Sequence, residues 1–112
     1  MLFANGKSFL VFPLKVFYSF TEIKAENNIA FGVGVSKRNF KNATDRNRVK
    51  RLLREAYRLN KIPLHQAIIT KQLNLFVLFV DKTLPQKRMD IDDKMIKIIN
   101  KLIKKNNDEL VV

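Results

Sequence analysis

Cationic side chains recur at helical spacing between Asp45 and Arg58. On a helical wheel of about 100° per residue, the cations and one amide gather within an arc of roughly 140°. The arc contains Arg46, Asn47, Lys50, Arg51, Arg54 and Arg58. Arg48 falls outside it. Guanidinium groups bind phosphate oxygens through a bidentate fork, so this array predicts a surface for the phosphate backbone of a nucleic acid.

The opposite side of the same helix is apolar and predicts burial. It carries Val49, Leu52, Leu53, Ala56 and Leu59, with Tyr57 at its border. Asn47, on the cationic side, adds a neutral donor and acceptor that suits a base edge or a ribose hydroxyl. One helix is therefore expected both to pack on a core and to present a row of cations.

Two other readings of this helix compete with nucleic-acid binding. A solvated charged face normally mixes signs, whereas only Asp45 and Glu55 oppose the cations here. A basic helix that lies on an anionic membrane or binds calmodulin would normally carry bulkier exposed apolar residues. The pattern favours nucleic acid over both.

The whole chain shares this cationic bias. Its 112 residues suffice for one domain, 1–112, and contain 22 Lys and Arg against 10 Asp and Glu, a net charge of +12. Polyanions are the natural partners, nucleic acid before an anionic membrane. The chain has no Cys, no apolar run near the roughly 20 residues that span a bilayer, and no signal-peptide pattern at its start. We therefore expect a cytoplasmic protein with no membrane partner.

Apolar, β-rich stretches predict the strands. Residues 8–20 are one such stretch, broken at Pro13, and the polar residues 21–28 are expected to form a hairpin loop. Residues 29–36 alternate, with Gly32 and Gly34 on one face and larger side chains on the other. The continuous apolar run 73–80 predicts a strand covered on both faces.

Helical periodicity predicts two helices, at 45–60 and 90–105. Thr44 or Asp45 is expected to cap the first helix, and Pro63 to end the helical region. The element order predicts an α+β domain with helices packed on a mainly antiparallel sheet.

Three segments together resemble the bacterial ribonuclease P protein component. They are residues 33–38 (Val-Gly-Val-Ser-Lys-Arg), Asn42 with Ala43, and residues 46–58, which begin with the Arg-Asn-Arg motif of that family. Family members carry a basic helix before a Phe-x-x-Gly segment, which Phe3 to Gly6 match. This chain begins almost at that segment, so the usual N-terminal helix is expected to be lacking.

The resemblance implies a two-layer α/β sandwich with a four-stranded sheet and a left-handed βαβ crossover, similar to a ribosomal-protein domain. It implies a subunit without catalytic residues, in a ribonucleoprotein endonuclease that removes the 5′ leader of precursor tRNA. The expected partners are the ribonuclease P RNA and precursor tRNA, with no stable protein partner. Mg²⁺ ions would be held mainly by the RNA subunit.

Carried over by position, the resemblance assigns RNA contacts to Lys37, Arg38, Asn42, Arg46, Asn47, Arg48, Lys50, Arg51, Arg54 and Arg58. Phe3 and Phe17 are the expected aromatics of a cleft for the single-stranded leader. Stacking on such rings tolerates any base, which suits a leader that differs between tRNAs.

The remaining candidates favour structural roles. His65 is the only histidine and has no nucleophile beside it in sequence. Asp90, Asp92 and Asp93 suit the start of a helix better than a metal site. The other phenylalanines, Phe76 and Phe12 among them, are expected in the core. A ribosomal or ribosome-assembly protein is the main functional alternative; a protein-only nuclease would need clustered carboxylates or paired histidines, and a basic membrane anchor also remains.

Overall fold

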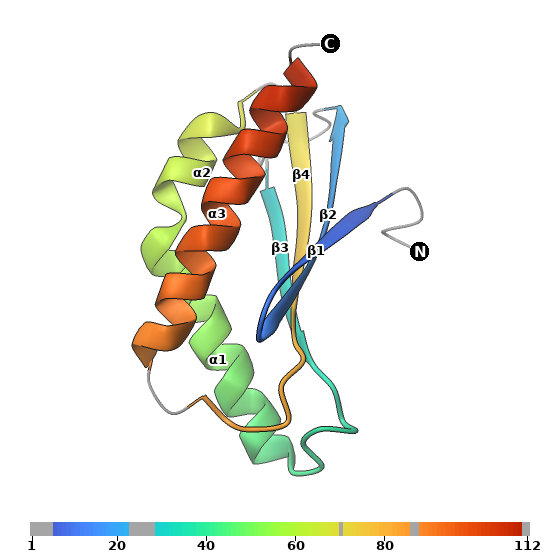
Figure 1. Cartoon of the computed structure of the whole chain (residues 1–112), viewed down its shortest axis with the longest axis vertical. Helices are drawn as coiled ribbons and strands as arrows, with labels where there is room; N and C mark the ends of the chain where they lie inside the picture. The colour runs from blue at the N-terminus through green and yellow to red at the C-terminus, as the bar shows by residue number, and fades with distance from the viewer. Residues whose placement is uncertain (1–5, 23–28, 70, 86–87, 111–112) are drawn as a thin grey trace.

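The structure, a computed structural model, describes residues 6–22, 29–69, 71–85 and 88–110. It is a two-layer α+β fold in which the helices cover one face of a single sheet (Figure 1). The elements in chain order are β1 (Lys7–Val11), β2 (Leu14–Glu22), β3 (Ile29–Val35), α1 (Ala43–Asn60), α2 (Ile62–Ala67), β4 (Lys71–Phe79) and α3 (Arg88–Leu110). The predicted fold class is confirmed. No helix within these ranges is long and apolar enough to cross a membrane.

The sheet is mixed, with strand order β1-β2-β4-β3. β2 pairs antiparallel with both β1 and β4, whereas β3 and β4 are parallel. The expectation of a hairpin around residues 21–28 is therefore wrong, because β4 lies between β2 and β3 in the sheet. The true hairpin joins β1 to β2 at the break predicted for Pro13. The chain passes from β3 to β4 through α1 and α2, the parallel crossover unit that the resemblance implied.

Burial alternates along β4, which corrects the expectation of a strand covered on both faces. Leu73, Leu75, Val77 and Phe79 are buried under the helices, and the residues between them are only half-buried. Residues 75–80 are all apolar, so periodicity alone could not show that only one face is covered. One sheet face therefore lacks a helical layer in the part of the chain that the structure describes.

The ends of the helical region also differ from the sequence prediction. Asn42, rather than Thr44 or Asp45, caps α1. Pro63 stands in the first turn of α2 instead of closing the helical region, since the missing N–H of proline is not needed there. Leu59, expected in the core, is 47% exposed, while Tyr57 is buried in its place.

Candidate RNA-binding surface

The rotation of α1 about its axis is fixed by the side chains that it buries. Val49, Leu53 and Ala56 are inaccessible to solvent, and the Tyr57 ring stacks on Phe31 of β3 with centroids 3.8 Å apart. The opposite side consequently faces solvent, as predicted. Asn47, Arg51, Arg54 and Arg58 are exposed there, and Arg46 and Lys50 are half-buried. We call Arg51 and Arg54, with Asn47 and Lys50, the cationic face of α1.

Asn42 fixes where α1 begins. Its backbone is extended, and its side-chain Oδ1 accepts a hydrogen bond from the backbone N–H of Thr44 at 2.8 Å. This satisfies one of the N–H groups that a helix start leaves without an intrahelical acceptor. Asn42, assigned above to RNA binding, thus has a structural task that sequence reasoning gave to its neighbours.

Arg46 is bound to the chain that precedes its own helix. Its Nη1 donates hydrogen bonds to the carbonyl oxygens of Phe40 at 2.7 Å and Lys41 at 2.9 Å. These bonds tie the first turn of α1 to the loop between β3 and α1. Arg46 therefore holds backbone atoms as well as lying beside the cationic face, a role that its place on a helical wheel did not reveal.

The same loop is anchored at its other residues. The N–H groups of Asn39 and Phe40 donate to the Ser36 carbonyl at 3.2 Å, and Phe40 is buried against Phe79. Asn39 Nδ2 reaches the carbonyls of Val80 and Asp81 after β4. Lys37, Arg38 and Lys41 are exposed on this loop. The structure thus brings the predicted Lys37 and Arg38 onto a loop tied to the start of α1.

Arg58, at the opposite end of α1, is engaged by an acidic neighbour. Glu55 accepts hydrogen bonds from its Nε, at 3.2 Å, and from its Nη2. Hydrogen bonding from Arg58 lowers the pKa of Glu55 against a smaller effect of desolvation, with help from the charges of Arg58 and Arg88. Arg88 of α3 lies 4.0 Å from the same carboxylate. The positive charge of Arg58 is therefore partly neutralised, unlike that of Arg54.

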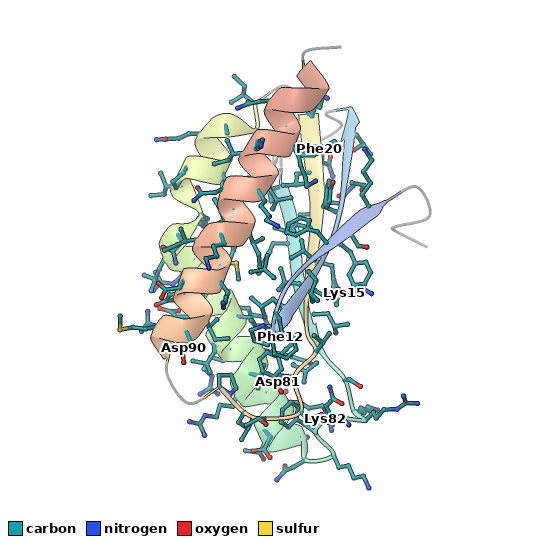
Figure 2. The ribbon with its side chains drawn as sticks, in the orientation of Figure 1. Phe12, Lys15, Phe20, Asp81, Lys82 and Asp90 are labelled. Atoms are coloured by element: carbon teal, nitrogen blue, oxygen red, sulfur yellow. The ribbon has the colours of Figure 1, made fainter. Side chains whose placement is uncertain are left out.

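Arg48 points away from the cationic face, as its wheel position predicted. It lines an open hollow at the start of α1, together with Phe40, Asp45, Lys82, Thr83, Leu84 and Pro85. Lys82 lies at the same end of the molecule as the start of α1 (Figure 2). Lys82 was not among the predicted residues, and nothing in its local sequence marked it, because the hollow forms only when the segment after β4 meets α1.

Phe17 lies on the sheet face that carries no helix. It is half-buried and pairs in register with Phe76 of β4, and Lys15 Nζ lies 5.4 Å from its ring centroid. Phe76 and Phe12 were expected in the core, which the structure corrects: Phe76 belongs to the uncovered face and Phe12 is 56% exposed. Phe3, the second predicted cleft aromatic, lies outside the described residues.

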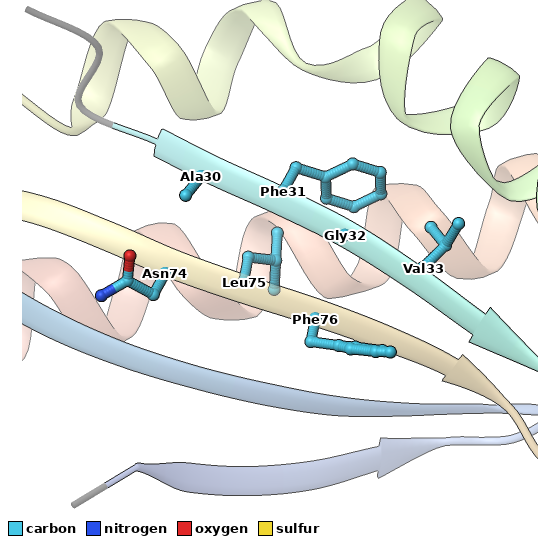
Figure 3. Close-up of a pocket in the computed structure, with 7 residues that line it drawn as sticks. All are labelled: Ala30, Phe31, Gly32, Val33, Asn74, Leu75 and Phe76. Carbon is cyan, nitrogen blue, oxygen red and sulfur yellow. The ribbon is translucent and has the colours of Figure 1, made fainter. Parts of the chain in front are cut away.

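An apolar pocket of ≈ 330 Å³ opens between β3 and β4. Figure 3 shows it on the sheet surface, lined by Ala30, Phe31, Gly32, Val33, Asn74, Leu75 and Phe76. Gly34 stands beside it, and a Cβ there would lie only 2.6 Å from Cζ of Phe76. Gly34 therefore lets the Phe76 ring lie across β3.

His65 has the structural role that sequence reasoning favoured. Its Nε2 lies 3.0 Å from the Tyr57 hydroxyl, and this hydrogen bond links α1 to α2. Desolvation, followed by the charge of Lys61, lowers the pKa of His65, and burial raises the pKa of Tyr57 to about 12. Both shifts favour the uncharged pair.

Acidic residues do not assemble a metal site on this surface. Across residues 6–22, 29–69, 71–85 and 88–110, no three His, Cys, Asp or Glu side chains gather closely enough to hold an ion. Asp92 instead lies 3.7 Å from Arg88 one turn earlier in α3.

The chain is similar to known proteins over most of its length. The family model Ribonuclease P matches residues 1–103. A ribonuclease P protein component from Porphyromonas gingivalis is 42% identical over 82 residues, which are 70% of this chain and 58% of that protein. One from Chlorobium phaeobacteroides is 44% identical over 63 residues, or 54% of this chain and 43% of that protein. The chain thus matches less than two thirds of the length of either relative.

Solved structures show the same fold. The ribonuclease P protein from Thermotoga maritima superposes with a TM-score of 0.70 over 88% of this chain and 86% of that chain, at 22% identity. The ribonuclease P protein from Staphylococcus aureus superposes with a TM-score of 0.63 over 89% of this chain and 83% of that chain, at 23% identity. Since the family model covers most of the sequence, the chain belongs to the ribonuclease P protein family.

Proposed function

We propose that this chain is the protein subunit of a bacterial ribonuclease P. It binds the catalytic RNA and the 5′ leader of precursor tRNA and assists endonucleolytic removal of that leader. The observation that carries this proposal is the cationic face of α1 beside a cationic loop that Arg46 holds in place. Membership of the ribonuclease P protein family supports an RNA partner, and the arrangement of these cations supports this surface as the place where RNA binds.

The rigidity of this surface supports phosphate binding. Arg51 and Arg54 project from a helix that buries Val49, Leu53 and Ala56 on its other side, so the positions of their Cα atoms are set before RNA arrives. Lys37, Arg38 and Lys41 add charge from an anchored loop, and Arg48 with Lys82 adds charge at the hollow. A preorganised array loses little conformational entropy on binding. Each phosphate that it neutralises releases counterions, so affinity falls as salt rises.

The uncovered sheet face supports leader binding. Phe17 and Phe76 lie in register on neighbouring strands, and Lys15 lies beside the Phe17 ring. Unpaired bases stack on aromatic rings, and a nearby ammonium group attracts the backbone between them. This combination has no hydrogen-bond code for particular bases, which suits leaders of different sequence.

The protein contributes binding and positioning in this proposal. The Mg²⁺ ions that the reaction needs would be held mainly by the RNA subunit. The cations of α1 reduce the repulsion between the RNA subunit and its substrate. We infer that the chain acts in the cytoplasm, without a membrane or stable protein partner.

Partner preference is the direct test. The dissociation constants of the chain for a bacterial ribonuclease P RNA and for a ribosomal RNA fragment of equal length are measured at several salt concentrations. We expect tighter binding to the ribonuclease P RNA. Arg51→Ala with Arg54→Ala should weaken it and lower the slope of log K against log salt by up to about two.

The lysine variant is the matched control. Arg51→Lys with Arg54→Lys keeps both charges and should keep the salt slope, with a smaller loss of affinity because the bidentate fork is gone. Equal or tighter binding to the ribosomal fragment would contradict the proposal and favour a ribosomal or ribosome-assembly protein. Circular dichroism establishes that each variant is folded.

A further inference from the structure

A second group of cations lies on α3, away from the cationic face of α1. The lysines of this helix are Lys94, Lys97, Lys101, Lys104 and Lys105. At about 100° per residue they fall within an arc of roughly 100°, on one flank of the buried stripe. Asp90 shares that arc and Asp93 borders it, and both stand before the first lysine. We call these five residues the lysine flank of α3.

The lysine flank faces β1, whereas the other flank of α3 faces α1 and α2. Lys101 and Lys105 lie over rings of β1 and β2, while Asn106 Nδ2 donates to the Ala67 carbonyl at the end of α2 and Arg88 approaches Glu55 of α1. In Figure 1, α3 runs between β1 on one side and α1 with α2 on the other. The two cationic surfaces therefore lie on different sides of the helical layer.

Aromatic rings hold part of the lysine flank in place. Lys101 Nζ and Lys105 Nζ lie 5.3 and 5.6 Å from the centroid of the Phe9 ring, and Lys105 Nζ also lies 5.7 Å from that of Tyr18. Phe9 is half-buried and Tyr18 is buried, with centroids 5.7 Å apart. Cation–π attraction thus gathers two ammonium groups above one aromatic floor between α3 and β1.

The ammonium groups of Lys101 and Lys105 carry positive charge that no ion pair seen among the described side chains neutralises. Like charges four residues apart on a helix repel each other, and here both converge on the same ring. The ion pairs seen among the described side chains join Arg58, Arg88, Glu55 and Asp92, and none reaches the lysine flank. An anion placed between Lys101 and Lys105 would relieve their repulsion.

We propose that the lysine flank of α3 is a second RNA-contact surface, which binds a phosphodiester segment separate from the one on α1. This inference rests on the proposed function for its choice of RNA over other polyanions. Ammonium groups act as point charges without the planar fork of arginine, so this contact is independent of sequence. α1, which is rich in arginine, positions the RNA, and α3 extends the footprint around the helical layer.

The test removes charge from the flank and measures RNA binding by the full chain. Lys97→Ala with Lys101→Ala changes two exposed side chains, so the fold should persist. Binding to a bacterial ribonuclease P RNA should weaken several-fold, and the salt slope should fall by up to about two units. In a variant that also carries Arg51→Ala and Arg54→Ala, the reduction in salt slope should equal the sum of the reductions in the two double variants, because the two surfaces bind different phosphates.

Two controls separate the lysine flank from net charge. Lys97→Arg with Lys101→Arg should keep the salt slope. Gln66→Glu with Ile69→Glu lowers the net charge by the same two units at exposed positions at and just after the end of α2, away from the lysine flank, and should lower the slope by less than the lysine variant does. An equal effect of the α2 control and the lysine variant would overturn the proposal, since net charge would then account for both.

The outcomes distinguish this inference from the proposed function. If the α1 variant loses affinity and the lysine variant binds like the wild type, the second surface is refuted and the proposed function stands. If the wild type prefers a ribosomal RNA fragment, the proposed function fails, and the effect of the lysine variant on that RNA decides the α3 surface. Flotation with phosphatidylglycerol vesicles that depends on Lys97 and Lys101, with unchanged RNA affinity, would overturn the RNA assignment in favour of a membrane.

Discussion

Arg46 donates a hydrogen bond from Nη1 to the carbonyl oxygen of Phe40 at 2.7 Å, across the junction between a loop and the helix that follows it. The same nitrogen binds the Lys41 carbonyl. An arginine of the Arg-Asn-Arg motif thus holds the backbone of a loop that carries Lys37 and Arg38. We propose that the order which Arg46 imposes on that loop is part of its contribution to RNA binding.

Replacement of Arg46 should therefore affect stability and RNA binding together. Arg46→Ala is expected to lower the free energy of unfolding by about 1 kcal/mol, because hydrogen bonds from a half-exposed charged group are lost. Arg51→Ala, on the exposed side of the same helix, should leave stability nearly unchanged. Denaturant unfolding of the two variants measures the difference, and equal stabilities would contradict the structural role of Arg46.

A double-mutant cycle tests whether Arg46 acts through the loop. If it does, the loss of RNA affinity caused by Lys37→Ala with Arg38→Ala should be smaller in an Arg46→Ala background than in the wild type. Strict additivity would instead assign Arg46 an independent contact with RNA.

Arg54 and Arg58 provide a second matched pair on α1. Arg54→Ala should weaken RNA binding more than Arg58→Ala, because Glu55 already engages the Arg58 guanidinium. Glu55→Gln should strengthen binding, since it removes the charge that competes with phosphate for Arg58. Titrations at one low salt concentration compare the three variants, and an Arg58→Ala loss as large as that of Arg54→Ala would contradict this ranking.

Gly34 and Gly32 test the close approach of Phe76 to β3. Gly34→Ala should lower the free energy of unfolding by about 1 kcal/mol, because its Cβ would meet the Phe76 ring and force it to move. Gly32→Ala should be neutral or slightly stabilising, since no atom lies within 4 Å of a Cβ there. Addition of Phe76→Leu should restore the Gly34→Ala variant. A Gly32→Ala loss as large as that of Gly34→Ala would show that the ring is not the cause.

Phe17 tests the proposed leader surface. Phe17→Ala should reduce affinity for precursor tRNA by roughly 1–3 kcal/mol, the range of one base–aromatic stack, and leave affinity for mature tRNA unchanged. Measurements use the complex with ribonuclease P RNA, so that both substrates are bound in the same way. Equal losses for the two substrates would place the contribution of Phe17 outside the leader.

The Tyr57–His65 pair predicts a pH dependence of stability. The folded-state pKa of His65 lies below its ordinary value near 6.5, so the unfolded chain binds more protons in that window. Neutral His65 therefore contributes to the stability of the fold above about pH 6.5, and this contribution is lost as pH falls through the lowered pKa. Unfolding midpoints between pH 5 and 8 should show this loss. The loss of stability at low pH should be smaller in His65→Gln. An identical pH profile for that variant would contradict the assignment of the loss to His65.

Local patterns in the sequence predicted the parts of the fold that depend on local interactions. The amphipathic spacing from Val49 to Tyr57 sufficed to orient α1, because burial of one side leaves the other to solvent. The alternation of glycine with larger residues predicted both faces of β3. The family resemblance supplied the parallel crossover, which local patterns do not contain.

Local sequence patterns could not predict the features that depend on contacts between residues far apart in sequence. The insertion of β4 between β2 and β3 pairs Phe17 with Phe76, residues that are far apart in sequence. The bonds of Arg46 to backbone carbonyls depend on the path of the preceding loop, and the approach of Lys101 and Lys105 to Phe9 depends on how α3 lies across β1. Helical wheels assign residues to faces, but they do not show what each face meets.

Cleavage of precursor tRNA by a bacterial ribonuclease P RNA at low magnesium tests the central claim most directly. The reaction is measured without protein, with this chain, and with the folded Arg51→Ala and Arg54→Ala double variant. We predict that the chain stimulates cleavage at the mature 5′ end and that the double variant stimulates it much less. Absence of stimulation by the folded wild-type chain, or equal stimulation by the double variant, would contradict it.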